Sequence, residues 1–578
     1  MRKFTADFET NVDVNDCRVW AYAICEIGNI DNFIYGNNIK DFIDWCSNKK
    51  ENYVLYFHNL KFDGEYIFSY LLSNGYELIR NKKERRDKTF TCLISDMGQF
   101  YSIEIFFDCH NPKHINKVTI YDSLKILNFS VEQIAKDFNL PIRKLELDYE
   151  EKREIGHVLT DHEIEYIKND VEIMARALEI MFNESLTKMT IGSSALKNYR
   201  ESTLSFLNYF PELPLEIDQD IRQAYRGGFT YCSPTYAGSE VGAGIVLDVN
   251  SLYPSVMYNE KMPFGYPIFF EGQYKRDVLH PLYIQMISCE FKVKKNMIPT
   301  IQIKHTLSFL NNEYVEETKG EPVTLALTNI DLELFFEHYD VYNITYHSGW
   351  KFKQISGLFT NYIDCWTEKK IEAKKNGNGA LYRIAKLMLN SLYGKFSKNP
   401  ITISKYPYLD PEEIIKYNMG EPEVGKGLYI PVGCFITAYA RRKTIETSQK
   451  IRNYTLEKYN KDYYIYSDTD SIHMLELPED ELKTFLDIDD YRLGAWKLES
   501  RFRRGKFIRQ KCYIEEEYED KLNVTIAGLP KKLGKYINFD NFEKGFTVSA
   551  SDIDNEHKLT YKHVKGGVML VATDFTIK

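Results

Sequence analysis

Hydrophobic positions in the first ~190 residues follow two different periods. Five runs rich in β-branched and aromatic residues predict strands: RKFTADFET, RVWAYAICEIG, NYVLYFHN, FYSIEIFFD and KVTIYDSL. Residues 161–182 instead carry apolar side chains every three or four positions, which predicts a helix, and Thr160 with Glu163 forms a capping box at its start. Strands that alternate with helices predict an α/β domain.

The pattern changes after this region. The glycine pair of YRGGF (residues 225–229) interrupts the periodicity and indicates a hinge or linker. Residues 265–320 are rich in strand and turn signals, whereas ALYRIAKLMLNSLYGKF (380–396) predicts a strong helix that stops at a glycine. Residues 399–427 are rich in proline and glycine and predict a small loop-like insertion. The later part of the chain is therefore expected to be α+β.

Composition narrows the class of protein. The chain has 578 residues, 44% apolar and 27% charged, as in folded proteins of two or more domains. It has ten cysteines but no CxxC pair, no signal sequence, no apolar run that spans a membrane and no P-loop. We therefore expect a soluble protein of the reducing cytoplasm. The net charge of −9 argues only weakly against nucleic-acid binding, because a local basic groove is sufficient.

Four carboxylates in the N-terminal third occupy positions that suit one shared site. Asp7 and Glu9 leave the same face of the first predicted strand. Asp63 lies in the first turn of the helix after HNLKFDG, and Asp170 lies one turn after Tyr166, beside an apolar stripe. Each acid alone is better explained as a helix cap or a solvated surface charge. Together, without histidine, they suit two hard cations about 4 Å apart that promote phosphodiester cleavage.

Acids also end two apolar strands that lie far apart in the sequence. Asp248 ends IVLDV, and YSDTDS carries Asp468 and Asp470 at strand spacing, which predicts that both face one side. A lone DxD is usually an Asx turn, but two strands that each end in an acid suit a metal site between them. A helix is predicted between these segments, and one of its faces carries Arg383, Lys386, Asn390 and Tyr393. This face suits a triphosphate and a base. The alternative is that it is simply the solvated side of an amphipathic helix.

The first acid set carries a family resemblance. DFE, NLKFDG and YIKND resemble, in order, the three motifs of the DEDD 3′–5′ exonucleases, in the variant with a tyrosine. The resemblance implies metal ligands at Asp7, Glu9, Asp63 and Asp170, with Tyr166 positioning the attacking water. It also implies residues that hold a single-stranded 3′ end: Thr10, Asn59, Phe62, Ser123, Leu124, Lys144 and Tyr149.

The second acid set resembles a polymerase. DVNSLYP, KLMLNSLYG and YSDTDS are similar, in order, to motifs A, B and C of family B DNA polymerases, and the likeness covers essentially the whole chain. It is strongest to the protein-primed branch found in small Bacillus-type phages. TAYAR (437–441) resembles a template-side signature, and two further DNA-binding signatures of the branch are similar to YRGGF (Tyr225, Arg226, Gly227, Gly228, Phe229) and RQKCY (Lys511, Tyr513).

That resemblance implies roles for single residues. Asp248, Asp470 and the Val249 carbonyl would bind two Mg²⁺ ions, for which Mn²⁺ can substitute, and Asp468 would be a weaker or outer ligand. Lys386 would bind the incoming triphosphate. The remaining implied contacts are Tyr253 under the sugar, Asn390 and Tyr393 at the new base pair, and Lys511 and Tyr513 at the primer end.

The resemblance also implies an architecture. An RNase H-like exonuclease domain would span residues 1–188, and a right-hand polymerase domain would span 189–578. The palm would comprise 189–259 and 428–534, the fingers 358–396 and the thumb 535–578. Two insertions, 260–357 and 397–427, are implied to clasp a terminal protein and DNA, and to form a tunnel linked to processivity and strand displacement.

Two features complicate the resemblance or add to it. The second triphosphate lysine is Lys370 if the long segment EKKIEAKKNGNGALYRIAK extends the tip of a helical hairpin, and Lys374 if it lengthens the first helix. Tyr382 stands where a third basic residue is expected. Residues 497–511 carry seven cationic side chains against one acid, which predicts a track for DNA phosphates.

The function expected from these features is a DNA-directed DNA polymerase with a proofreading 3′–5′ exonuclease. Its partners would be DNA, deoxynucleoside triphosphates and a terminal protein, and it would act as a monomer in a bacterial host cytoplasm. One alternative is a nuclease whose polymerase half only binds, against which the intact Asp248 and Asp470 argue. The other is a non-catalytic replication protein, which leaves two complete acid sets unexplained.

Overall fold

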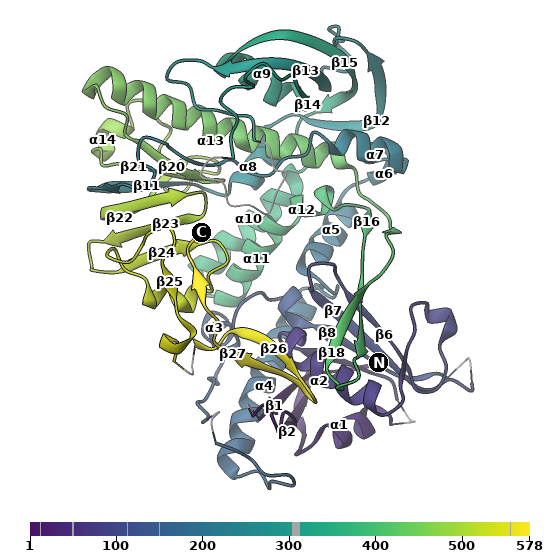
Figure 1. Ribbon diagram of the computed structural model, residues 1–578. Coiled ribbons are helices and arrows are strands. Elements are labelled where there is room, and N and C mark those ends of the chain that lie inside the picture. The colour runs from purple at the N-terminus through teal and green to yellow at the C-terminus, as the bar shows by residue number, and fades with distance from the viewer. Residues whose placement is uncertain (12, 49–50, 112–113, 149–150, 303–312, 555–556) are drawn as a thin grey trace.

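The computed structural model describes residues 1–11, 13–48, 51–111, 114–148, 151–302, 313–554 and 557–578 (Figure 1). Its N-terminal sheet has the strand order β3-β2-β1-β4-β8-β7-β6-β5. Parallel pairing joins β1 to β4 and β4 to β8, and antiparallel strands flank this centre. The strands are β1 (Arg2–Thr10), β2 (Val19–Glu26), β3 (Asn29–Gly36), β4 (Tyr53–Phe57), β5 (Glu77–Leu78), β6 (Thr89–Ile94), β7 (Phe100–Asp108) and β8 (Asn116–Asp122).

The helices around this sheet explain how its acids become buried. They are α1 (Ile39–Cys46), α2 (Leu60–Ser73), α3 (Val131–Asp137) and α4 (Asp161–Asn183). The five predicted strands and the capped helix are confirmed, including the capping box of Thr160 and Glu163. Strand alternation turns Phe4, Ala6 and Phe8 of β1 into one apolar core. The alternate side chains, Asp7 and Glu9 among them, therefore face α4.

A second, antiparallel sheet forms the palm-like centre of the chain. Its order is β24-β23-β22-β11-β21-β20-β9, with β10 paired to β22. The helices beside it are α8 (Leu252–Asn259), the long α13 (Ile430–Tyr459) and α14 (Glu479–Leu482). Its strands are β9 (Thr230–Cys232), β10 (Glu240–Val241), β11 (Gly244–Val249), β20 (Tyr464–Asp468), β21 (Ser471–Leu475), β22 (Trp496–Arg509), β23 (Cys512–Glu517) and β24 (Leu522–Ile526).

A third sheet packs on α13, at the top of Figure 1. Its order is β12-β15-β13-β14, and it carries α9 (Asn329–His338). The strands are β12 (Met262–Glu271), β13 (Leu282–Val293), β14 (Val323–Thr328) and β15 (Tyr339–Ile355). The strand-rich prediction is therefore confirmed for its described part. The remaining helices are α5 (Ile191–Ser202), α6 (Phe206–Tyr209), α7 (Leu215–Arg222), and the hairpin of α10 (Thr360–Lys375) and α11 (Gly379–Ser391) with α12 (Tyr393–Ser397).

Two predictions about local structure are wrong. The helix expected over 380–396 is interrupted at Leu392, between α11 and α12, and the Met388 carbonyl one turn earlier accepts the Tyr362 hydroxyl at 2.8 Å. The expected stop, Gly394, lies inside α12. Residues 399–427 are not loop-like. They form two-stranded ladders, β16 (Ile401–Thr402) with β19 (Glu423–Val424) and β17 (Lys405–Leu409) with β18 (Ile415–Met419), because alternating apolar residues pack on the N-terminal core.

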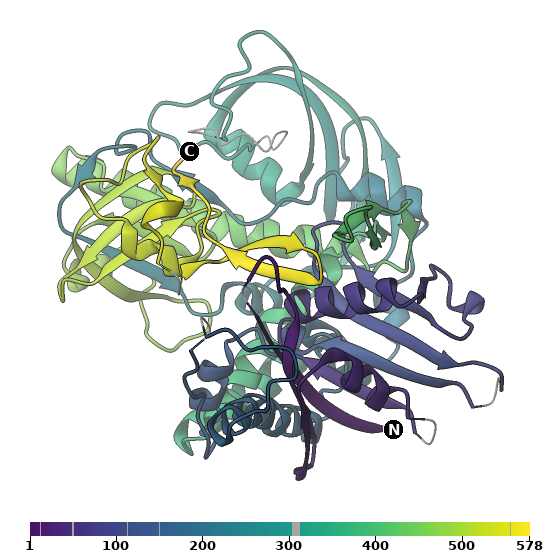
Figure 2. The ribbon, with the colours of Figure 1, turned by 60° about the horizontal axis from the view of Figure 1, so that its bottom comes forward.

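The C-terminal region returns to the N-terminal half. It contains β25 (Thr547–Val548) paired with β28 (Phe575–Thr576), and the hairpin of β26 (Thr560–Val564) and β27 (Gly567–Val571). Figure 2 shows this hairpin reaching across the molecule, and β27 contacts α2. Across the described residues, no helix combines the length and the apolarity that crossing a membrane requires.

Candidate active sites

The four acids of the N-terminal third converge between β1, α2 and α4. Carboxylate oxygens of Asp7, Glu9 and Asp170 lie within 4.8 Å of one another. Asp63 lies on the first turn of α2, close enough for the charges of Asp7 and Glu9 to raise its pKa. The Thr5 hydroxyl fixes the distance between β1 and α4 by donating to the Val171 carbonyl at 2.7 Å.

Burial places these acids in electrostatic conflict. Burial, followed by the neighbouring Asp170, raises the pKa of Asp7 to about 7. The pKa of Glu9 and the pKa of Asp63 are raised well above their ordinary values by burial and then by nearby carboxylates. Asp63 Oδ1 and Asp170 Oδ1 are buried without a hydrogen-bond partner among the described residues. Buried, unpaired carboxylate oxygens in such a group fit divalent cations.

Two further predicted residues adjoin Asp170. The Lys144 ammonium forms an ion pair with it and lies 5.3 Å from the Tyr166 ring centroid. The Tyr166 side chain hydrogen-bonds the same carboxylate, which lowers the pKa that burial raises. Tyr166 is itself buried, so its hydroxyl is held at the acid cluster by packing.

The predicted strand-holding residues differ in accessibility. Thr10, Asn59, Phe62 and Leu124 are half-buried. Ser123 is fully buried, and its hydroxyl donates to the Phe57 carbonyl at 3.0 Å, so its side chain is committed to the fold. Tyr149 lies outside the described residues.

The second acid set forms where β11 and β21 pair. The register places Asp248 opposite Ser471 on β21 and opposite Lys497 on β22. The Val249 N–H donates to the Asp470 carbonyl at 2.8 Å, which links the two sequence segments directly. The expected strand spacing of the DTD motif is wrong, however. Asp470 lies in a two-residue hairpin turn after β20, where Thr469 has φ +60°.

The acids of this turn have unequal partners. Asp468 accepts from Lys511 Nζ at 2.8 and 3.0 Å and from the Thr230 hydroxyl at 3.1 Å. Burial, then Glu499 and Asp470, raises the pKa of Asp248 to about 7, and Lys497 Nζ, 3.5 Å away, offsets only part of this. The pKa of Asp470 is likewise raised, chiefly by burial. Asp248 and Asp470 thus retain uncompensated charge that suits cations, whereas Asp468 is already neutralised.

Comparisons with known proteins agree with this geometry. A family model described as DNA polymerase type B, organellar and viral, matches residues 45–484. The chain belongs to this family of DNA polymerases. The DNA polymerase of Bacillus phage Nf is 44% identical over 100% of both chains, and that of Bacillus phage phi29 is 42% identical over 100% of this chain and 99% of its own.

Solved structures extend the match to the whole fold. Phi29 DNA polymerase complexed with primer-template DNA and incoming nucleotide substrates is 42% identical, has a TM-score of 0.90 and aligns over 100% of both chains. The predicted fold class is therefore confirmed: an exonuclease domain precedes a palm, fingers and thumb polymerase domain. The chain is therefore a DNA-directed DNA polymerase, as the sequence indicated.

The predicted nucleotide residues lie on four helices of the polymerase, α8, α10, α11 and α12. Tyr253 of α8 stacks on Tyr393 of α12, with ring centroids 4.0 Å apart and an interplanar angle of 20°. Lys386 and Asn390 are exposed on α11. Burial and the neighbouring Lys386, Lys374 and Lys497 lower the pKa of Lys370. Arg383 does not join this face, because it pairs with Asp137 of α3 at 2.7 Å.

YRGGF is not a free hinge in the polymerase. Arg441 of α13 donates to the carbonyls of Arg226 and Gly227, both at 2.8 Å, and is held by Asp331 of α9 through both carboxylate oxygens. A Cβ on Gly228 would lie 2.5 Å from Thr469 Oγ1, so only glycine lets this loop touch the DTD turn. Tyr225 is half-buried, whereas Phe229, Thr437 and Arg441 are buried and present no side chain to solvent.

The basic stretch 497–511 is less available than its charge suggests. Arg501 pairs with Glu476, and Arg503 and Arg504 both pair with Glu516. Lys511 is occupied by Asp468, and Tyr513 packs on Tyr466 and Phe507. A DNA phosphate at this stretch would have to compete with these surface ion pairs, which are individually weak.

Sequence reasoning missed Glu499. It is the acid whose charge most raises the pKa of Asp248, and it lies at a β-bulge where β22 passes β11. The usable signal was a lone acid among seven cationic side chains, two residues after Lys497. A bulge re-aims a side chain in a way that period-two alternation does not predict.

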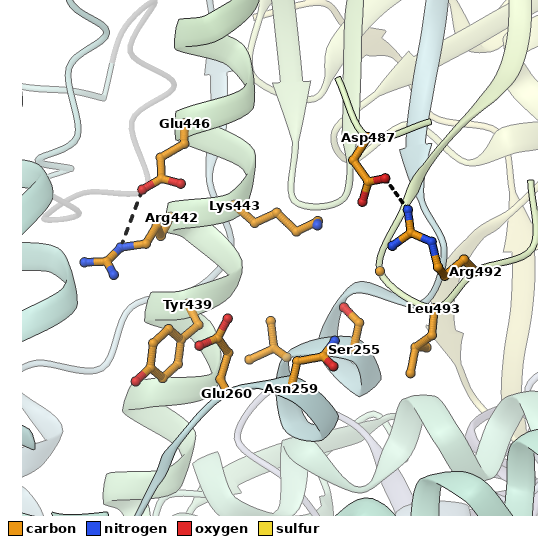
Figure 3. Close-up of a pocket in the computed structure, with 12 residues that line it drawn as sticks. Ser255, Asn259, Glu260, Tyr439, Arg442, Lys443, Glu446, Asp487, Arg492 and Leu493 are labelled. Atoms are coloured by element: carbon orange, nitrogen blue, oxygen red, sulfur yellow. Dashed lines mark hydrogen bonds and ion pairs between the residues drawn. The ribbon is translucent and has the colours of Figure 1, made fainter. Parts of the chain in front are cut away.

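A cavity of about 340 Å³ opens between α8, α13 and residues 487–494 (Figure 3). Lys443 points into it between two ion pairs, Arg442 with Glu446 and Arg492 with Asp487. None of the predicted site residues lines this cavity. Its walls balance cations against acids, which separates it from both acid sets.

Proposed function

We propose that Asp248 and Asp470, with the Val249 carbonyl, bind the two divalent ions of nucleotidyl transfer, and that Asp468 is an outer partner. The observation that carries this assignment is the hydrogen bond from the Val249 N–H to the Asp470 carbonyl, which joins the end of β11 to the turn after β20, and the pKa of Asp248 and that of Asp470 are both raised. Bound Mg²⁺, or Mn²⁺ in its place, would activate the primer 3′-hydroxyl and stabilise the leaving pyrophosphate. The chain itself positions the acids and, through Lys497, limits their repulsion.

The substrate nucleotide would lie against α10, α11 and the stacked tyrosines. Lys370 and Lys386 would bind the triphosphate. Position supports Lys370 over Lys374, because Lys370 is half-buried near Lys386 and Lys497 while Lys374 is exposed. Tyr253 would contact the sugar and exclude a 2′-hydroxyl. Asn390 and Tyr393 would face the new base pair, and Lys511 and Tyr513 the primer end.

The N-terminal set would remove misincorporated nucleotides. Asp7, Glu9, Asp63 and Asp170 would hold a second pair of divalent ions, and the buried unpaired oxygens of Asp63 and Asp170 support this. Tyr166 and Lys144 would orient groups at Asp170. The single-stranded 3′ end would lie along Thr10, Asn59, Phe62 and Leu124, with Ser123 acting through the backbone it fixes.

The domain limits proposed from the sequence suit the observed elements. The 1–188 limit falls between α4 and α5, and the first insertion (260–357) contains the third sheet. The second insertion (397–427) contains β16–β19, and the thumb (535–578) contains β25–β28. The palm (189–259 and 428–534) and fingers (358–396) occupy the remainder.

We also infer that synthesis is protein-primed and strand-displacing, that the polymerase acts as a monomer, and that it works in a bacterial cytoplasm. The whole-chain likeness to polymerases of Bacillus phages supports these inferences. The test of priming is Mg²⁺-dependent transfer of one dAMP to a hydroxyl of the cognate terminal protein. Normal extension of a DNA primer without this transfer would refute protein priming alone.

The two acid sets are tested by reciprocal substitution. Asp470→Asn should abolish nucleotide addition and leave degradation of single-stranded DNA intact, because the acid sets lie on separate sheets. Asp170→Ala should do the opposite. Extension near the wild-type rate by Asp470→Asn would refute the metal assignment, and equal loss of both activities would indicate misfolding.

A further inference from the structure

Two hairpins from the polymerase side meet on exonuclease helix α2. The hairpin β17–β18 and the C-terminal hairpin β26–β27 both contact this helix (Figures 1 and 2). Ile415, Val564 and Val568 are buried in the same core as Leu60 of α2. The hairpin tips also touch, through an ion pair between Glu413 and Lys565. Helix α2 is thus held from two sides by distant segments.

A buried carboxylate joins all three elements. Glu65 of α2 is 2% exposed, and it accepts a hydrogen bond from the Tyr417 hydroxyl of β18 at 2.7 Å. His563 Nε2 of β26 lies 3.0 Å from the other Glu65 oxygen, without hydrogen-bond alignment. A carboxylate this buried is tolerated only with such partners. Loss of either partner therefore favours release of its hairpin.

Tyr561 lies two residues before His563, on the same face of β26. Its hydroxyl accepts a hydrogen bond from the Asn59 side chain at 3.2 Å. Phe62 packs edge-on with a centroid distance of 6.2 Å, and Lys61 Nζ lies 4.9 Å from the ring centroid. Asn59 has φ +77° and makes no side-chain cap of its own helix, so Tyr561 sets the direction of its amide.

We propose that Tyr561 is a positioning residue for the single-stranded 3′ end, acting through Asn59, and that Glu65 holds its hairpin in place. The inference rests on the proposed strand-binding role of Asn59. The strand site is then completed by a residue 502 positions away in sequence. Excision depends on a seated C-terminal hairpin, whereas nucleotide addition at Asp248 and Asp470 does not.

The direct test is equilibrium binding of a fluorescent oligodeoxythymidylate to the whole protein, with Ca²⁺ so that no strand is cut. Tyr561→Phe removes only the hydroxyl and should weaken binding about fivefold, the effect of one net hydrogen bond. Asn59→Ala should weaken it by a similar or larger factor. The double variant should be no weaker than Asn59→Ala alone, because both act through one contact. The proposal would be overturned if the double variant lost affinity by the product of the two single losses, or if Tyr561→Phe bound the strand as tightly as the wild type.

The role of Glu65 in holding the hairpin, and a matched control, are tested in the same binding assay. Glu65→Ala should weaken binding about as much as Tyr561→Phe, and Glu65→Gln, which keeps an acceptor for Tyr417, should recover most of the loss. If Glu65→Ala unfolds the protein, Glu65→Gln and Tyr561→Phe still decide the outcome. Tyr408→Phe removes a hydroxyl from an exposed tyrosine of β17 and should have no effect.

Catalysis separates this proposal from the proposed function. In Mg²⁺, Tyr561→Phe should raise the KM for degradation of the oligonucleotide about fivefold and leave kcat unchanged, because the acid set is untouched. Addition of one nucleotide to a paired primer should be unchanged. A wild-type protein that binds the strand but does not degrade it would refute the exonuclease assignment. The positioning role of Tyr561 would then still be decided by the binding constants of the single and double variants.

Discussion

The two acid sets contain the same chemical group in opposite surroundings. The exonuclease set (Asp7, Glu9, Asp63 and Asp170) gathers four carboxylates in a buried space, where Lys144 forms an ion pair with Asp170. The palm set (Asp248, Asp468 and Asp470) has lysines beside two of its acids, since Lys497 faces Asp248 and Lys511 forms an ion pair with Asp468. The first set is therefore a strongly repulsive, closed site, whereas the second is partly compensated and opens toward the cationic helices α10 and α11.

This difference has a mechanistic meaning. Excision needs only a strand end and water, so a closed acid cluster can bind ions tightly. Nucleotide addition must admit a triphosphate and release pyrophosphate at each step, which favours acids whose repulsion is already moderated by lysine side chains. The comparison predicts that single substitutions act on one set alone, and that the two sets respond differently to removal of metal.

The largest expected effect separates the acids within the palm. Asp248→Asn should slow single-nucleotide addition by roughly 10³-fold, because a ligand shared by both ions is lost. Asp468→Asn should slow it only about tenfold, since Lys511 and Thr230 already satisfy that carboxylate. Rapid-quench kinetics on a paired primer measure both, and degradation of single strands is the control. Equal losses would contradict the unequal roles assigned to the two acids.

The next effect concerns the lysines of the fingers. Lys370→Ala should raise the KM for the incoming nucleotide about 30-fold, because a half-buried cation loses its charged contact with phosphate. Lys374→Ala should raise it by less than about threefold, since an exposed ammonium is screened by solvent. Steady-state kinetics at saturating primer distinguish them. If Lys374→Ala had the larger effect instead, the extra residues of this segment would lie within α10, and Lys374 would be the lysine that binds the triphosphate.

Much of this fold was visible in the sequence because periodicity and capping are local. The strand RKFTADFET, with Asp7 and Glu9 on one face, and the capped helix with Asp170 needed no tertiary information. The meeting of Asp248 with Asp470 is different. It depends on pairing between strands more than 200 residues apart, which the acid at the end of each strand suggested and the family motifs made specific.

The failures share a physical cause. Asp470 was expected on a strand, but a left-handed Thr469 makes a tight turn that composition does not reveal. Glu499 was missed because a bulge directs it toward Asp248. Residues 399–427 read as a loop because their apolar positions find a partner only on the distant exonuclease core. Tertiary contacts, rather than local preference, decide such segments.

A smaller effect tests the tyrosine of the exonuclease set. Tyr166→Phe should slow excision about tenfold, the effect of one hydrogen bond to a charged carboxylate. Nucleotide addition should stay at the wild-type rate. The measurement is degradation of a labelled single strand, with Tyr491→Phe, an exposed tyrosine of the palm, as matched control. An equal loss in Tyr491→Phe would mean that the assay reports general damage.

The last comparison asks how far each set destabilises the metal-free protein, where no change in activity is expected to report it. In the folded state the pKa of Asp7 is raised to about 7, above its ordinary value of 3.8, so the ionised carboxylate opposes folding at pH 8. Asp7→Asn should therefore raise the local free energy of unfolding of β1 by about 2 kcal/mol in a chelator. Hydrogen exchange of the β1 amides measures this gain.

The pH and metal dependence of that gain distinguish it from simple packing. It should shrink as the pH falls from 8 to 6, because Asp7 then binds its proton in the folded state. Mg²⁺ should reverse its sign by stabilising the wild-type carboxylates. Asp468→Asn should give no such gain in β20, because the Lys511 ammonium already pairs with that carboxylate. Equal gains in both sheets would remove the electrostatic contrast between the two acid sets.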